Sequence, residues 1–239
     1  MYQQSPGTYY FQVAAANDQN INLTPWLIGL ANSSGIVSTI KTIDWTGLIG
    51  ITGPCFSGSW IYDSGTLYAF VPCSNANSDV SGFDIYWATV NLSGSVATVS
   101  TPTLLSLTNG GTPYHNIYDP KPWKIGSKYY LWMTKYLSST DGEVELASAS
   151  SVTGPYAMVK TGDWAGWHAA LGRFEGPTMY STGATSWRLA MEAIGGTPPA
   201  QVMYYSDCNT LDITACVWTA PQPWHEDQKY RHGSVVKNF

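Results

Sequence analysis

A short β-rich unit recurs about every 50–60 residues along this chain, and this repetition limits the fold more than any other feature. Each copy contains a strand, a tight turn and a returning strand, followed by a further strand. The third copy is the clearest, with residues 122–125, the turn Gly126-Ser127 and residues 128–134. The second copy turns at 63–65 and the fourth at 182–183. Short β units of this spacing are typical of propeller blades.

We therefore expect an all-β chain in which residues 1–239 form a single β-propeller domain. No stretch has a sustained 3.6-residue apolar period, so helix should be minor. A β-sandwich is the alternative, because it too has many short strands between turns. In the first copy only residues 1–5 precede the hairpin, so we expect the chain to begin inside its first blade. A last strand at 233–236 either stands alone or completes that blade.

The composition excludes some functions. The chain has 11 Trp and 16 Tyr, and aromatic side chains with a polar edge suit both strands and sugar-binding surfaces. A net charge of -5 without a basic run argues against a nucleic-acid partner. No segment is long and apolar enough to predict a membrane span, and the first residues do not form a signal peptide.

The cysteines and three sequons predict a secreted protein. Cys55 and Cys73 flank one predicted hairpin, and Cys208 and Cys216 close a short loop. An even number of cysteines in local couples favours two disulfides over a metal site, since no CxxC spacing is present. Asparagines in N-x-S/T sequences, which are candidate glycosylation sites, are Asn22, Asn32 and Asn91.

Two carboxylates occupy matching places in neighbouring copies. Asp119 lies at the start of the inner strand of the third copy, and Glu175 at the start of that of the fourth. Inner strands of a propeller converge on its axis, so both side chains should project into one central pocket. A pair of carboxylates is what glycoside hydrolysis requires. The alternative is an Asp-Pro turn at Asp119 and a solvated Glu175, or one paired with Arg173.

Other candidates are less specific. His115, Trp60 and Trp123 could contact a sugar, although a lone histidine is usually solvated and most tryptophans of such folds are buried. Arg231 could bind hydroxyls or hold a carboxylate. The acidic run Asp141, Glu143 and Glu145 is interpreted as a solvated loop.

The order and spacing of several short motifs resemble glycoside hydrolase family 43. These motifs are Ile117-Tyr118-Asp119-Pro120, the hairpin 126–132, Phe174-Glu175-Gly176-Pro177 and Arg231-His232-Gly233-Ser234-Val235-Val236. The stretch 174–195 is also similar to the related family 62 arabinofuranosidases. The resemblance covers most of the chain and implies a five-bladed β-propeller that cleaves arabinose- or xylose-containing plant polysaccharides with inversion.

In that family pattern Glu175 matches the general acid, and Asp119 matches the aspartate that orients the acid and tunes its pKa. His232 matches a histidine near the axis that in many members lies beside a central ion or water. The resemblance implies a polysaccharide or oligosaccharide substrate and no required cofactor, and it leaves a structural calcium open. We expect a monomer, unless another chain completes the propeller.

The chain departs from the pattern at the general base, which the family carries as an Asp-Pro aspartate on the first inner strand. Residues 1–6 contain no acid, and Asp18, Asp63 and Asp84 do not match that position. Either the base precedes this sequence, or the protein has none. A non-catalytic carbohydrate-binding propeller and an assembly subunit completed by another chain therefore stand beside the hydrolase as alternatives.

Overall fold

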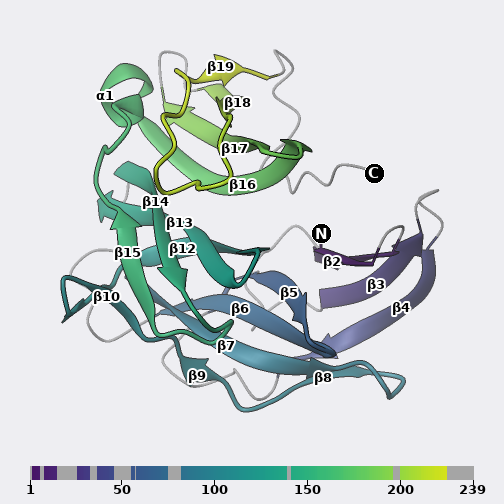
Figure 1. Cartoon of the computed structure of the whole chain (residues 1–239). Coiled ribbons are helices and arrows are strands. Elements are labelled where there is room, and N and C mark those ends of the chain that lie inside the picture. Colours follow the sequence, from purple (N-terminus) through teal and green to yellow (C-terminus); the bar gives the residue numbers. More distant parts are fainter. Residues whose placement is uncertain are drawn as a thin grey trace.

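The computed structural model describes residues 2–5, 8–14, 26–32, 37–45, 55–56, 58–74, 82–138, 141–195 and 200–224. Within these ranges the chain is all-β and contains a single short helix, as the sequence predicts. Among the same residues, no helix has the length and apolar character needed to cross a membrane. Figure 1 shows the six-stranded sheet lying between a large sheet below it and a four-stranded sheet above it.

The first two β units share the large sheet, whose order is β1-β2-β3-β4-β8-β7-β6-β5 with β9 paired to β7. Each unit is an antiparallel meander, and the parallel pair β4–β8 joins them. The strands are β1 (Tyr2–Ser5), β2 (Thr8–Ala14), β3 (Trp26–Asn32), β4 (Val37–Asp44), β5 (Ser59–Asp63), β6 (Thr66–Ser74), β7 (Phe83–Asn91), β8 (Ala97–Val99) and β9 (Thr103–Leu104).

The third and fourth units form separate sheets, with the orders β11-β10-β15-β14-β13-β12 and β16-β17-β18-β19. Their strands are β10 (Leu107–Asn109), β11 (Thr112–Pro113), β12 (Ile117–Ile125), β13 (Lys128–Ser138), β14 (Asp141–Ala149), β15 (Tyr156–Lys160), β16 (Arg173–Gly183), β17 (Ser186–Gly195), β18 (Ala200–Cys208) and β19 (Gln222–Pro223). The helix α1 (Trp167–Leu171) lies just before β16. The four predicted copies are therefore four consecutive meanders.

Alternate side chains of strand β13 pack into two different hydrophobic cores. Leu131 and Met133 pack with side chains of the large sheet, whereas Tyr130 and Trp132 pack with those of the four-stranded sheet. Successive side chains of a strand point to opposite faces, so an uninterrupted apolar run is expected where both faces are covered. The six-stranded sheet is thus buried on both sides.

Alternate side chains of β5 likewise enter two cores, one shared with the first unit and one shared with the third. On β5, Trp60 enters the core shared with β3 and β4, while Ile61 enters the core shared with the six-stranded sheet. Each unit therefore packs face to face with the next. A sandwich has two packed sheets, whereas here three sheets pack in succession.

Both predicted disulfides are present. Cys55 is joined to Cys73 and Cys208 to Cys216, with sequence separations of 18 and 8. No cysteine of the described residues is free. Disulfides of this kind are usual in proteins of oxidising compartments, and their position is consistent with an extracellular protein.

The first unit contains the strand that the sequence left in doubt. Residues Tyr2–Ser5 form β1, which pairs antiparallel with β2 and contacts β5, the first strand of the next unit. The expectation that this strand is missing is therefore not supported. Its sequence, Tyr-Gln-Gln-Ser, contains no carboxylate.

Candidate active site

Asp119 and Glu175 occupy equivalent places in adjacent sheets. Each is the third residue of its strand, Asp119 on β12 and Glu175 on β16. In both strands the register shifts immediately afterwards, at Asp119-Pro120 and at Gly176-Pro177. Bulges at such places redirect a side chain and are frequent beside active sites. A β-bulge directly after the third residue of the strand therefore sets the direction of both carboxylates.

The backbone at both bulges enters the left-handed region. Asp119 has φ 49° and Gly176 has φ 61°. Glycine adopts this conformation without steric cost, and aspartate tolerates it better than most residues. The motif Phe174-Glu175-Gly176-Pro177 thus depends on its glycine for the turn of the chain that follows Glu175.

A hydrogen-bond network joins the two strands at this point. The main-chain N–H of Gly176 donates to Asp119 Oδ2 at 3.0 Å and also approaches Thr134 Oγ1 at 3.1 Å. The Thr134 hydroxyl in turn donates to Asp119 Oδ2 at 2.9 Å. One carboxylate oxygen therefore receives two donors, and it fixes the position of the peptide that links Glu175 to Gly176.

Glu175 is buried, with 2% of its surface exposed. Its Oε2 accepts a hydrogen bond from the Tyr136 hydroxyl at 3.0 Å and forms an ion pair with Arg173. The Arg173 guanidinium also lies over the Tyr136 ring, 4.7 Å from its centroid. The expected pairing with Arg173 is thus confirmed, whereas the solvated position is not. This environment holds Glu175 in one orientation.

Aromatic rings continue from Tyr136 towards the second unit. The ring centroids of Tyr136 and Tyr118 are 4.2 Å apart, and those of Tyr118 and Phe83 are 4.3 Å apart. Burial raises the pKa of Tyr136, and the charges of Glu175 and Asp119 raise it further. Tyr136 therefore remains a hydrogen-bond donor to Glu175 throughout the physiological pH range.

Two more charged groups lie near the carboxylates. Glu192 on β17 is the cross-strand neighbour of Glu175 and is fully buried. Burial lowers the pKa of Lys121, two residues after Asp119, and the charge of Asp119 partly offsets this effect. Arg188, the arginine of β17, forms a two-point ion pair with Asp207.

The tryptophans predicted to contact sugar lie elsewhere. Trp60 is 5% exposed and stacks on Trp45 at a centroid distance of 5.7 Å, so its ring belongs to the core. Trp123 packs edge-on against Trp187 at 6.5 Å, in the core shared with the four-stranded sheet. Neither ring offers an open face beside Glu175.

His115 contacts a carboxylate other than Asp119 and Glu175. Its Nδ1 contacts both carboxylate oxygens of Asp84, at 3.0 and 3.1 Å. His115 is therefore paired with Asp84 and is not a freely solvated side chain, and its contact with a sugar stays a prediction.

Arg231, His232 and Asn22 lie outside the described residues, as does the Asn32 side chain. Asn91 ends β7 with an exposed side chain, whose Oδ1 accepts a hydrogen bond from the Ser93 N–H at 2.9 Å. Within the described part of the chain, no three Asp, Glu, His or Cys side chains gather as metal ligands. The predictions of glycosylation and of a central ion stay predictions.

The acidic run is a strand and not a solvated loop, so that expectation was wrong. Glu143 and Glu145 lie on β14 and are 8% and 0% exposed. The Tyr114 hydroxyl and the Gly162 N–H both donate to Glu145 Oε1, at 2.9 and 2.7 Å. Burial raises the pKa of Glu145 to about 7. Segment 161–171 covers this face of β14, which the local sequence pattern did not predict.

Sequence reasoning also missed Thr134 and Tyr136, which hold Asp119 and Glu175. Both side chains come from β13, the strand that pairs with β12. The only signal was the polar character of Thr134 inside an otherwise apolar strand. A buried polar residue in such a run requires a partner.

No protein-family model and no curated protein sequence matches the chain. Solved structures do match. An α-L-arabinofuranosidase from Lactobacillus brevis aligns with 93% of this chain and 72% of its own, at 14% identity and a TM-score of 0.59. An α-L-arabinanase from Cellvibrio cellulosa aligns with 86% of this chain and 71% of its own, at 14% identity and a TM-score of 0.56.

A xylan β-1,4-xylosidase from Bacillus halodurans aligns with 98% of this chain and 43% of its own, at 16% identity and a TM-score of 0.56. The TM-scores show a shared fold, and at 14–16% identity the likeness shows no more than the fold. The chain therefore has the fold of these glycoside hydrolases.

Proposed function

We propose that this protein is a glycoside hydrolase with a five-bladed propeller that acts on arabinose- or xylose-containing polysaccharides. In this proposal Glu175 is the general acid and Asp119 is a positioning residue. The reaction is a single displacement in which water attacks the anomeric carbon and the configuration is inverted. Glu175 gives its proton to the leaving oxygen as the glycosidic bond breaks, the attacking water releases a proton to the solvent, and Glu175 takes up a proton again before the next turnover.

One observation carries the proposal: the hydrogen bond from Gly176 N–H to Asp119, which links matching bulges on two neighbouring inner strands. A carboxylate with only a structural role would not need to recur at the same place in two neighbouring units. An acid catalyst needs a fixed orientation, because proton transfer depends on reach and angle. The likeness to arabinofuranosidase, arabinanase and xylosidase structures is what suggests the substrate class.

Two observations favour a second candidate, a carbohydrate-binding protein without turnover. Strand β1 carries no carboxylate to activate water. In addition, Glu175 accepts hydrogen bonds from Arg173 and Tyr136, which is the arrangement of an ionised carboxylate. Donation to a leaving oxygen requires a proton on Glu175, and Arg173 and Tyr136 both bind its Oε2.

Incubation with arabinoxylan and arabinan, followed by analysis of released sugars, tests the choice. The hydrolase proposal expects release of arabinose or xylose, with the inverted anomer seen first by NMR. Saturable polysaccharide binding without release would instead establish the binding protein. A product that first appears with retained configuration would contradict the single-displacement mechanism.

A further inference from the structure

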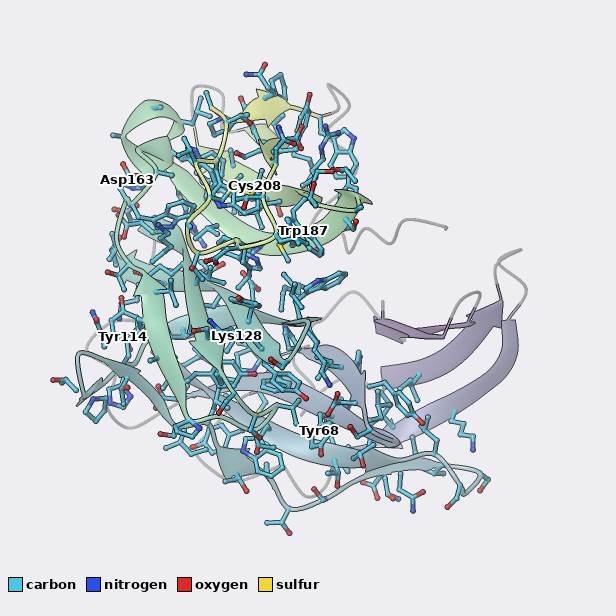
Figure 2. All side chains as sticks on the ribbon, viewed as in Figure 1. Tyr68, Tyr114, Lys128, Asp163, Trp187 and Cys208 are labelled. Carbon is cyan, nitrogen blue, oxygen red and sulfur yellow. A yellow bond between two sulfur atoms is a disulfide. The ribbon has the colours of Figure 1, made fainter. Side chains whose placement is uncertain are left out.

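A cavity of about 280 Å³ lies between the second and third units, lined by residues other than Asp119 and Glu175. Its walls come from the start of β7, from segment 104–108 and from segment 113–117. Figure 2 shows one of its wall residues, Tyr114, on the flank of the six-stranded sheet. Leu104, which lines the cavity, is 48% exposed, so the cavity meets the surface there.

The polar wall of the cavity is built around His115 and Asp84. Asp84 is 5% exposed, and a carboxylate that is so buried needs a partner. Because an ionised carboxylate only accepts hydrogen bonds, its contact with His115 Nδ1 places the ring proton on Nδ1. In the neutral ring Nε2 is then an acceptor. Within the described residues Nε2 has no hydrogen-bond partner, and the His115 side chain is 33% exposed.

The wall beside His115 is held rigidly. The Tyr114 hydroxyl is bound to Glu145, and Lys135 Nζ lies 4.4 Å from the centroid of the Tyr114 ring. Lys135 also donates to the main-chain oxygen of His115. Tyr114 and His115 are thus fixed from behind by groups that do not line the cavity, as expected of a preformed binding site.

The remaining lining indicates the kind of ligand. Aliphatic side chains form most of the cavity, and Ser106 and Thr108 add hydroxyl groups. A compact molecule with C–H surfaces and several hydroxyl groups is complementary to such a wall, because each hydroxyl can donate to Nε2 or pair with Ser106 or Thr108. At ~30 Å³ per water the volume equals about nine waters, which is room for a molecule of about ten non-hydrogen atoms.

We propose that this cavity is a binding site for a single pentose, separate from the Asp119–Glu175 centre. The hydroxyl groups of the sugar bind His115 Nε2 and the Ser106–Thr108 segment, and its C–H faces lie on the aliphatic wall. The choice of a pentose over other small polyols rests on the proposed function. The existence of the site rests on the cavity and on the Asp84–His115 pair alone.

The test is an NMR titration of the isotope-labelled Glu175→Gln protein with L-arabinose, D-xylose and D-glucose. This variant separates cavity binding from turnover. We expect saturable shifts around residues 104–115 with a dissociation constant of about millimolar for a pentose. Ser106→Trp, at an exposed lining residue, should fill the cavity and weaken binding at least tenfold. His115→Gln should weaken it about three- to tenfold, which corresponds to one hydrogen bond.

Ser127→Trp, in the exposed β12–β13 turn, is the matched control and should leave binding unchanged. Absence of saturable binding, or binding that Ser106→Trp does not affect, overturns the proposal. Glucose binding as tight as pentose binding overturns the assignment of the sugar class. Failure of hydrolysis with intact cavity binding contradicts only the proposed function, so the two failures are distinguishable.

Discussion

The main-chain N–H of Gly176 donates a hydrogen bond to Asp119 Oδ2 at 3.0 Å, across the junction of the third and fourth units. This bond makes the position of Glu175 dependent on Asp119, even though the two residues are 56 positions apart in the sequence. The Thr134 hydroxyl strengthens the same link.

Replacement of Thr134 by valine should lower both stability and turnover. The change keeps the shape of the buried side chain but leaves Asp119 with one donor fewer, at a cost of about 1–2 kcal/mol in the free energy of unfolding. Turnover should fall with little change in KM, because Glu175 loses its fixed position. Denaturant unfolding and steady-state kinetics measure both effects. Thr134→Ser keeps the hydroxyl, so equal losses in the two variants would contradict this role.

Arg173 and Glu175 should be strongly coupled. Arg173→Met leaves a buried carboxylate without its ion-pair partner and should cost about 3–5 kcal/mol of unfolding free energy. In the double variant with Glu175→Gln much of that loss should be recovered. A double-mutant cycle by urea unfolding measures the coupling. Strictly additive losses would show that the ion pair contributes nothing.

Glu145 should make the protein less stable as the pH rises. Its folded-state pKa of about 7 exceeds the ordinary value of 4.5, so the protonated form is favoured by folding. The stability is fully present below about pH 4.5 and is lost as the pH rises through 7, by about 3 kcal/mol in all. Glu145→Gln should remove this dependence in unfolding experiments between pH 5 and 8, at about constant ionic strength.

Asp212→Asn is the control with the opposite sign. Hydrogen bonds from Thr214 lower the pKa of the exposed Asp212, so its contribution is lost only as the pH falls below the usual value. This variant should keep the slope of the wild-type protein above pH 5. An unchanged slope in Glu145→Gln would refute the assignment of the titration to Glu145.

The two disulfides should contribute unequally. In the chain-entropy view, the Cys55–Cys73 link closes the longer loop and is worth about 3 kcal/mol, and the Cys208–Cys216 link about 2.5 kcal/mol. Unfolding of the two paired Cys→Ala variants compares them. A larger loss from the Cys208–Cys216 variant would show that contacts of the loop, and not its length, decide the contribution.

Local patterns predicted much of the fold. The turn 63–65, the turn Gly126-Ser127 and the cysteine couples depend on neighbouring residues, and all of them are found in the structure. The matching positions of Asp119 and Glu175 could also be predicted, because repeated units carry equivalent residues at equivalent places of their strands. The fourth turn falls at Ala184-Thr185, just beyond the predicted position.

The burial of a strand face by segments distant in the sequence could not be predicted in the same way. The sequence Asp141-Gly142-Glu143-Val144-Glu145 alternates acidic residues with others, as in a strand with one solvated face. That face is covered by segment 161–171 and by Tyr114, which are distant in the sequence. For Trp60 the sequence left both a sugar contact and a buried position open, and stacking on Trp45 from another unit decides for the buried position.

The central claim is that Glu175 is a general acid, and the leaving group tests it most directly. Kinetics of the wild-type protein and Glu175→Gln should be compared on arabinoxylan and on aryl pentosides with an activated leaving group. General acid catalysis predicts a loss of about 10²–10⁴ in kcat on the polysaccharide, and little loss on the aryl glycoside, whose departure needs no proton. Equal losses on both substrates, or full activity of Glu175→Gln on the polysaccharide, would contradict it.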